Sequence, residues 1–161
     1  MQENELQFRP AGRDDADITF KFFEQIQKLH ADAEPEFFRQ PVKDVLFREY
    51  FANVLKAPDQ HIAFGCLDDI EIGYVQYFLG TSPKTIYQPE RRIAHINLLA
   101  VTHEYQGQGI ATKLLDYVKE QATCQGVGSI GLESWAFNIS ARACFEKAGF
   151  RATRGSMWLK L

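Results

Sequence analysis

Two glycines separated by one residue stand where an apolar run gives way to a helical repeat. The run covers residues 96–101, Gly107 and Gly109 follow a polar turn, and the repeat begins at Ile110. A helix N-terminus leaves its first N–H groups without intrahelical partners, and the helix dipole adds positive potential there. Because glycine has no Cβ, an anion can approach these N–H groups closely. Residues 106–111 (Gln-Gly-Gln-Gly-Ile-Ala) therefore predict a phosphate or pyrophosphate site, with a tight turn that binds nothing as the alternative.

Two nucleotide-binding motifs also place glycines at the start of a helix. The dinucleotide fingerprint Gly-x-Gly-x-x-Gly would use Gly107 and Gly109, with Glu133 at the end of the next expected strand as its acidic residue. Thr112 stands where the third glycine belongs, and only roughly a third of the chain remains for the rest of a doubly wound sheet. A P-loop is excluded because no Gly-Lys-Ser/Thr follows.

The elements that must position this turn follow from apolar periodicity and turn residues. Strands are predicted at 6–9, 61–67, 70–80, 91–101, 128–134, 150–154 and 156–161, and helices at 14–29, 43–56, 109–125 and 138–149. Asp68 and Asp69 suit a hairpin turn, Gly155 a turn between the last two strands, and Asn138 and Gly149 the two caps of the last helix. The order β-α-α-β-β-β-α-β-α-β-β predicts an α/β fold with a mixed (α+β) sheet and helices on both faces.

Composition limits the classes of function. The 161 residues are 45% hydrophobic and 24% charged, which predicts one domain, residues 1–161, with its own core. A net charge of −3 and a pI near 5.8 give no support for binding nucleic acid or an anionic membrane. No apolar run approaches the ~20 residues that span a bilayer, and the start, MQENELQFRP, lacks the features of a signal peptide.

Cysteine and histidine spacing gives no indication of a metal centre. Cys66, Cys124 and Cys144 are odd in number and widely spaced, which argues against a disulfide framework or zinc site and for a reducing cytoplasm. The four histidines show no ligand spacing such as HExxH. We therefore expect a cytoplasmic protein without a metal.

Two blocks of the sequence resemble the signature of the GNAT (general N-acetyltransferase) superfamily. Gln-x-x-Gly-x-Ala at 106–111, preceded by LAV and EYQG, is similar to the acyl-CoA motif Gln/Arg-x-x-Gly-x-Gly/Ala of that family. Residues 132–150, LESWAFNISARACFEKAGF, resemble its block Leu-Glu-Val-x-x-x-Asn-x-x-Ala-x-x-x-Tyr-x-x-x-Gly-Phe. The resemblance is strong from about residue 93 to residue 150. It implies the GNAT fold with a splayed central sheet, and transfer of an acetyl group from acetyl-CoA to an amine.

The resemblance also implies where acetyl-CoA binds. In that family the strand carrying INLLAV splays from the strand carrying SIGLES, and the pantetheine arm lies between them, bonded to unpaired backbone groups at Leu99 and Val101. The pyrophosphate would lie on N–H groups at the glycine turn, and Asn138 would reach the arm while capping its helix. The implied cofactor-binding residues are Leu99, Ala100, Val101, Gln106, Gly107, Gln108, Gly109, Ile110, Ala111, Thr112, Asn138, Ala141 and Phe145.

Acyl transfer to an amine needs a base, because an alkyl ammonium with a pKa near ~10.4 must lose a proton before it attacks. The resemblance implies two candidates, Glu133 of the second block and His95, which stands where histone-type members place a glutamate; a water relay is the third possibility. It also implies the Leu99 N–H as the oxyanion donor. Phe145 replaces the family's usual tyrosine, so we expect no dedicated acid, or water in that role.

The acceptor is not identified by the sequence. The resemblance implies a groove walled by residues 29–41 and 81–92, in which Asp32, Glu34 and Glu36 beside two phenylalanines would suit a cationic, partly apolar amine or would simply form a solvated acidic loop. The acceptor would be a small-molecule or peptide amine. The alternative function, suggested by the missing tyrosine, is an acyl-CoA-binding sensor or scaffold. The ending SMWLKL suggests a homodimer, or else a tryptophan packed in the chain's own core.

Overall fold

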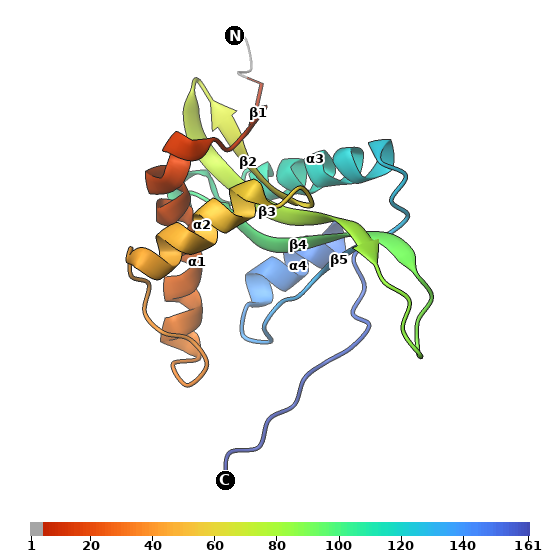
Figure 1. Ribbon diagram of the computed structural model, residues 1–161. Coiled ribbons are helices and arrows are strands. Elements are labelled where there is room, and N and C mark those ends of the chain that lie inside the picture. Colours follow the sequence, from red (N-terminus) through yellow and green to blue (C-terminus); the bar gives the residue numbers. More distant parts are fainter. Residues whose placement is uncertain (1–4) are drawn as a thin grey trace.

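One five-stranded sheet organises residues 5–161, the part of the chain that the computed structural model describes (Figure 1). Its order along the sheet is β1–β2–β3–β4–β5, with β1–β4 antiparallel and β5 parallel to β4. The strands are β1 (Gln7–Pro10), β2 (Gln60–Leu67), β3 (Ile70–Ser82), β4 (Arg91–Val101) and β5 (Ile130–Leu132). This mixed sheet confirms the α/β fold class. Residues 1–4, part of the stretch judged to lack signal-peptide features, lie outside the described residues.

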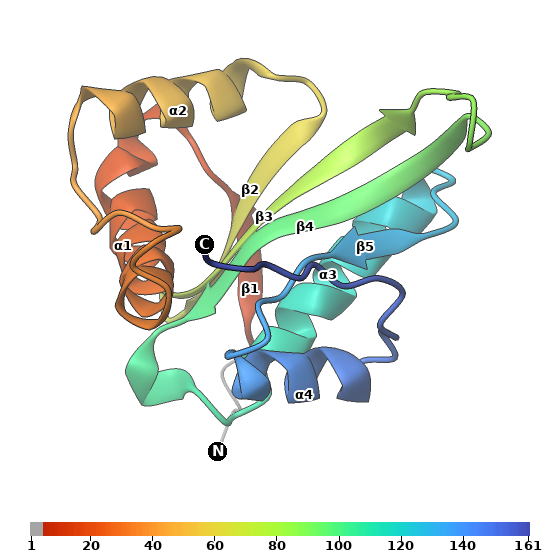
Figure 2. The same ribbon diagram turned by 90° about the horizontal axis from the view of Figure 1, so that it is seen from below.

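Four α-helices cover the two faces of the sheet, in pairs that are consecutive in the sequence (Figures 1 and 2). They are α1 (Ala16–Ala33), α2 (Val45–Lys56), α3 (Ile110–Cys124) and α4 (Ile139–Lys147), with short 3-10 turns at Arg13–Asp15 (η1) and His103–Tyr105 (η2). Phe22 of α1 and Phe47 of α2 join a core with Tyr74 of β3. Leu114 of α3 joins the second core, against Val75 on the opposite face of β3. Alternation along β3 therefore supplies both cores.

Two local features fix how α3 lies on the sheet. Asp68 and Asp69 take positive φ values of 49° and 63°, as a two-residue hairpin turn between β2 and β3 requires, which confirms the predicted turn. Farther along β3, a Cβ on Gly73 would lie 3.0 Å from Leu114 Cδ1 and 3.2 Å from Ile110 Cγ2. The missing side chain lets the first turn of α3 pack directly on β3.

The last two predicted strands are not formed. Within the described chain, residues 151–161 belong to neither a helix nor a strand, and Trp158 is 76% exposed rather than packed in a core. The expectation from residues 150–154 and 156–161 was therefore wrong, although the expected order holds as far as α4. The physical reason is that alternating apolar residues form a strand only where a neighbouring strand pairs with them.

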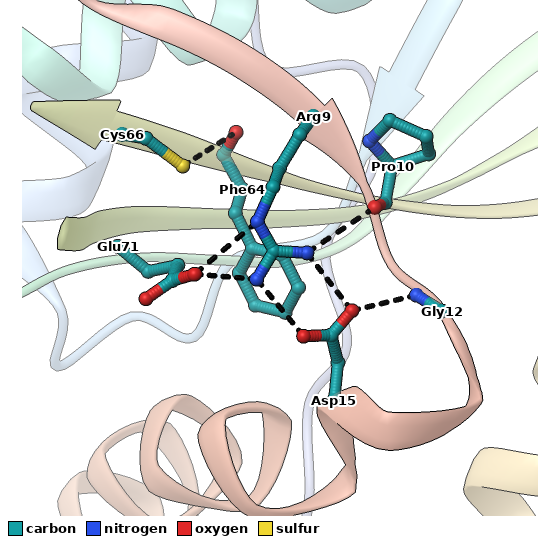
Figure 3. Close-up of polar contacts among 7 residues, drawn as sticks. All are labelled: Arg9, Pro10, Gly12, Asp15, Phe64, Cys66 and Glu71. Atoms are coloured by element: carbon teal, nitrogen blue, oxygen red, sulfur yellow. Dashed lines mark hydrogen bonds and ion pairs between the residues drawn. The ribbon is translucent and has the colours of Figure 1, made fainter. Parts of the chain in front are cut away.

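Arg9 joins the start of the chain to β3 (Figure 3). Its two Nη atoms donate to the two carboxylate oxygens of Asp15 at 2.9 Å, and Nε donates to Glu71 Oε1 at 3.2 Å. The guanidinium also lies 4.7 Å from the centre of the Phe64 ring. The Gly12 N–H donates to Asp15 Oδ2 at 2.6 Å, so the turn that leads into α1 is fixed by the same carboxylate.

This arrangement predicts a pH-dependent contribution to stability. The hydrogen bonds from Arg9 hold the pKa of Asp15 below its usual range. A carboxyl with a lowered folded-state pKa stabilises the fold above its unfolded pKa of ~3.9, and that contribution is lost as the pH falls through the folded value. We expect Asp15→Asn to lower the free energy of unfolding by about 1–3 kcal/mol at pH 7. The difference from the unsubstituted protein should shrink as the pH falls below about 4, as urea denaturation at several pH values would measure.

The matched control for this prediction is Asp116→Asn. Asp116 pairs with Lys119 on α3, and its side chain is 61% exposed. Exposed pairs of this kind contribute little. Asp116→Asn should therefore change the free energy of unfolding by at most about 0.5 kcal/mol, both at pH 7 and at acidic pH. Equal effects of the two substitutions would contradict the role assigned to Asp15.

Candidate functional site

The strands β4 and β5 separate partway along their length. They pair only at Ala94–Ile130, His95–Gly131 and Ile96–Leu132, and β4 then continues to Val101 (Figure 2). On its other side, β4 shifts register against β3, so that Asn97 has no partner on β3. A β-bulge of this kind bends its strand and increases the local twist. The bulge therefore lies just where β4 loses β5 as a neighbour.

Backbone groups of β4 face the space that β5 leaves. The Thr102 N–H donates to Ile72 O on β3 at 2.9 Å, and in an antiparallel ladder the direction of the backbone groups alternates. The peptide groups of Ala100 consequently face β3, whereas those of Leu99 and Val101 face the opposite side. This is the side on which the resemblance placed unpaired groups.

The carbonyl of Val101 is not free, which corrects one part of that expectation. It accepts a hydrogen bond from Gln25 Nε2 on α1 at 2.9 Å and another from Gln106 Nε2 at 3.1 Å. Leu99 and Val101 were expected to offer unpaired backbone groups, but the carbonyl of Val101 is hydrogen-bonded within the chain. Gln25 was missed by sequence analysis, because nothing near it in the sequence indicates a contact 76 residues away.

The glycine turn is built as an open loop at the start of α3. Gly107 and Gly109 have φ values of 75° and 82°, and a Cβ on either would meet no atom within 4 Å. No side chain caps the helix, whose first backbone bond runs from the Lys113 N–H to Gly109 O at 3.1 Å. Gln108 donates to the carbonyl of Glu104 at 2.9 Å, so its side chain is used to hold the turn. The backbone N–H groups of residues 110–112 come before this first bond and have no partner within the helix. The side chain of Ile110 is nevertheless buried in the core.

The start of α4 has the cap that the sequence predicted. Asn138 Oδ1 accepts a hydrogen bond from the Ala141 N–H at 3.2 Å. Farther along, Phe145 is half-buried and its ring lies edge to face with Phe150 at 6.1 Å. The Phe150 N–H donates to Phe145 O, and Gly149 has φ 94°, which together end the helix as expected. The side chain of Phe145 carries no group that could move a proton.

His95 is oriented by a chain of side-chain hydrogen bonds. Asn97 Nδ2 donates to Gln60 Oε1 at 3.1 Å, so the oxygen of the same amide faces the imidazole. That oxygen lies 3.0 Å from His95 Nδ1 and must accept, which requires the proton to be on Nδ1. In the neutral imidazole, Nε2 then carries a lone pair. This is the tautomer that a base acting through Nε2 requires.

Glu133 lies in a different setting. Its carboxylate pairs with Arg154 at 2.6 Å, and the two side chains are 71% and 80% exposed. A base paired with a guanidinium must break that contact before it takes a proton. The structure thus separates the two candidates, since His95 is half-buried and held by Asn97 whereas Glu133 is exposed and ion-paired.

A pocket of about 380 Å3 lies beside the His95 hydrogen-bond chain. Its wall combines polar side chains with two apolar ones. The polar side chains are those of Tyr50, Asn53, Gln60, Gln76 and Asn97, and the apolar ones are those of Val54 and Ala57. Gln76 is buried; its Nε2 donates to the Tyr50 hydroxyl at 2.6 Å, and its Oε1 accepts from the Tyr74 hydroxyl at 3.0 Å. Burial raises the pKa of both tyrosines. No charged side chain lines this pocket, and no pattern in the sequence indicates that its lining residues would meet.

Two carboxylates of the acidic stretch at the end of α1 and directly after it are paired within the chain. Asp32 contacts Lys28 at 2.7 Å and Gln40 at 3.1 Å, and Glu36 pairs with Lys160. Residues 81–92 lie far from this segment in both views, so the two do not wall a single groove as the resemblance implied (Figures 1 and 2).

Residues 5–161 contain neither a cluster of metal ligands nor a helix suited to a membrane. Across 5–161, no three His, Cys, Asp or Glu side chains gather in a way that could hold a metal ion. Within the same range, no helix combines the length and the apolar character that crossing a membrane requires.

Comparisons with known proteins agree on one family. Residues 23–150 match the model of the acetyltransferase (GNAT) family. N-alpha-acetyltransferase 30 of Schizosaccharomyces pombe is 39% identical over 56 residues; the match covers 35% of this chain and just over a third, 37%, of that protein's length.

Solved structures share the fold at low sequence identity. The BH1408 protein of Bacillus halodurans, as a tetramutant, is 20% identical, with a TM-score of 0.87 over 96% of this chain and 99% of that one. The aminoglycoside acetyltransferase AAC(6')-Iy, in complex with a bisubstrate analogue that contains CoA, is 13% identical with a TM-score of 0.76 over 98% of each chain. At these identities the likeness establishes the architecture alone.

Proposed function

The chain belongs to the acetyltransferase (GNAT) family and is an acyltransferase, and from this premise we propose that it transfers the acetyl group of acetyl-CoA to a primary amine by direct attack. The observation that carries the proposal is the bulged β4, which leaves β5 at Ile96 and has an oriented imidazole at His95. The acceptor is the amine of a small molecule or a peptide. The three free cysteines fit a protein of the reducing cytoplasm.

Acetyl-CoA fits the residues that border the separated strands. The N–H groups at residues 107–112 would hold its pyrophosphate, because the open space beside Gly107 and Gly109 is what a side chain there would fill. The N–H groups of Leu99 and Val101 would bond its pantetheine arm, with Ala100 between them and Asn138, Ala141 and Phe145 on the α4 side. When bound, acetyl-CoA supplies the thioester that the amine attacks.

The chain's own residues supply the remaining chemistry. His95 Nε2 takes a proton from the ammonium form of the acceptor, and Asn97 keeps Nδ1 protonated while it does so. The Leu99 N–H donates to the carbonyl oxygen as negative charge develops on it. Phe145 carries no proton donor, so the sulfur would leave as a thiolate, and the proton that the attacking nitrogen releases as the amide forms would go to that thiolate or to solvent.

The pocket beside Asn97 supports a small polar amine as acceptor. Its side-chain amides and the Tyr50 hydroxyl can hydrogen-bond hydroxyl or amide groups of the acceptor without adding charge. Two similar proteins illustrate the range to test, since one is named for N-alpha-acetylation and another was crystallised with sisomicin. Aminoglycosides and peptide N-termini are therefore the first two acceptor classes to compare.

The experiment is thiol release from acetyl-CoA across a panel of amines that includes both classes. We expect release that depends on the amine and the enzyme. Binding of acetyl-CoA without release on any amine would instead favour a sensor or scaffold, the alternative that the missing tyrosine suggests. A thermal shift with acetyl-CoA, run alongside, shows whether the cofactor binds at all.

Replacing Phe145 with tyrosine tests the departure of the thiolate. We expect turnover to change less than about tenfold, because a thiol leaving group with a pKa near ~8.5 can depart without a proton. Phe150→Tyr, which alters the ring packed against Phe145, is the matched control. A larger increase for Phe145→Tyr alone would show that the site lacks an acid it needs.

A further inference from the structure

An aromatic patch joins two segments that lie far apart in the sequence. One segment, residues 30–38, contains the end of α1 and the turn after it, and the other, residues 133–138, connects β5 to α4. The rings that meet, which we call the aromatic patch, are those of His30, Phe37, Phe38, Trp135 and Phe137. None of these five side chains has a part in the proposed chemistry.

The rings of the patch have the geometry of favourable aromatic pairs. The ring centroids of Trp135 lie 5.4 Å from Phe37 and 5.0 Å from Phe38, the latter at an interplanar angle of 68°. His30 lies 4.9 Å from Phe38 and 5.5 Å from Phe137, edge to face with the second ring. Aromatic pairs prefer such offset or edge-to-face arrangements at these separations. The patch is therefore formed before any ligand arrives.

Parallel pairing places the patch along the second half of β4. β5 pairs with β4 as far as Leu132 and Ile96, so residues 133–138 continue in the direction that β4 takes toward Val101 (Figure 2). From the other side, α1 is held at that end of β4 by the hydrogen bond from Gln25 to the Val101 carbonyl. The rings thus meet beside the space in which the proposed function places acetyl-CoA.

The rings keep exposed surface on which a further ring can pack. Phe37 is 44% exposed although Trp158 lies 5.3 Å from it, and the other four rings are half-buried. Burying the remaining aromatic surface is favourable, and a ring gains more from it than an aliphatic group because aromatic pairs also attract each other electrostatically. Exposed apolar clusters beside a site mark ligand-binding surfaces. The acceptor is the ligand that must approach the thioester here.

The charges around the patch favour an uncharged ring over a further cationic group. The two segments carry four carboxylates, those of Asp32, Glu34, Glu36 and Glu133. Three of them are paired within the chain: Asp32 with Lys28, Glu36 with Lys160 and Glu133 with Arg154. A carboxylate beside a cation leaves little field at a distance. An acceptor with several ammonium groups would gain little from this surface, whereas an aromatic group would bury its faces against the rings.

We propose that the aromatic patch selects the acceptor, and that the acceptor is a primary amine that carries an aromatic group. The acceptor's ring packs on Trp135 and Phe37 while its amine is presented to His95. Residues 133–138 then form the wall that the resemblance assigned to residues 81–92. This inference rests on the proposed function, because it concerns the acceptor of the same reaction.

The test is the affinity of two amines for the protein in excess CoA, measured by isothermal titration calorimetry. L-phenylalaninamide and L-alaninamide share the amine and the amide and differ only in the phenyl group. We expect L-phenylalaninamide to bind about tenfold more tightly, because its ring is buried on the patch. Trp135→Ala should remove most of this difference by weakening L-phenylalaninamide alone, and Trp135→Phe, which keeps a ring, should retain it.

Two further variants make the test specific. Phe37→Ala, at the most exposed ring of the patch, should act in the same direction as Trp135→Ala with little risk to the fold. Tyr87→Ala is the matched control, because it removes an aromatic side chain that is 87% exposed in the loop between β3 and β4. It should leave both affinities unchanged. Circular dichroism would verify that each variant is folded.

The outcomes separate this inference from the proposed function. Equal affinities of the two amides, or an equal effect of the patch substitutions on both, would overturn the selection by the patch, whether or not acetyl-CoA is turned over. Thiol release from acetyl-CoA is measured with the same two amides. If L-phenylalaninamide is preferred through Trp135 but no amine causes thiol release, the proposed function fails while the aromatic site stands.

Discussion

Replacing His95 with glutamine is expected to lower kcat/KM for the best amine about 10²–10⁴-fold, with little change in the affinity for acetyl-CoA. Glutamine keeps a polar side chain but cannot accept a proton from an ammonium group. We propose His95 as the base because the hydrogen bonds from Gln60 through Asn97 place the proton on Nδ1, which leaves a lone pair on Nε2. Steady-state kinetics and cofactor titration would measure the two quantities separately.

Two further variants make this prediction specific. Asn97→Ala frees the imidazole without removing it, so we expect a smaller loss, about tenfold. Glu133→Gln should change kcat/KM less than about threefold, because its exposed carboxylate is already paired with Arg154. A loss for Glu133→Gln as large as that for His95→Gln would assign the base to the carboxylate instead.

Replacing Gly109 with alanine is expected to weaken acetyl-CoA binding about 10–100-fold, equivalent to about 1.4–2.8 kcal/mol. The substitution has two physical effects. A Cβ projects into the open space beside the N–H groups of the turn, and the φ of 82° is strained for any residue with a side chain. Isothermal titration calorimetry would measure the change in affinity.

Gly126→Ala separates these two effects. Gly126 has φ 68° and equally open surroundings, but it lies at the other end of α3. The two variants should therefore lose a similar amount of stability, about 1 kcal/mol, and only Gly109→Ala should lose affinity for acetyl-CoA. If both variants lost affinity equally, the glycine turn would have no direct part in binding.

The central part of the fold could be predicted because its signals are local. The bounds of β4, the Asp68–Asp69 hairpin and the cap of Asn138 on Ala141 each depend on residues within a few positions of one another. Apolar periodicity and turn preferences therefore sufficed for the element order as far as α4. The same holds for the glycine turn, whose positive φ values follow from the residue type.

The candidate site could be predicted only in part. The motifs left Glu133, His95 and a water relay as alternatives, with Glu133 ahead of His95. Their surroundings come from distant residues: Gln60, 35 positions before His95, completes the hydrogen-bond chain of His95, and Arg154 pairs with Glu133. The carbonyl of Val101 and its donor Gln25 come from elements far apart in the sequence. Such contacts exist only after the helices pack on the sheet.

By itself, the sequence determined the family, the order of the elements as far as α4 and the open turn at Gly107 and Gly109, since these depend on residue types at short spacing. Tertiary structure alone decided the bulge at Asn97, the tautomer of His95 and the extended form of residues 151–161. The physical reason is that a strand, a bulge or an oriented imidazole is defined by its partner, and pairing requires two segments that only folding brings together.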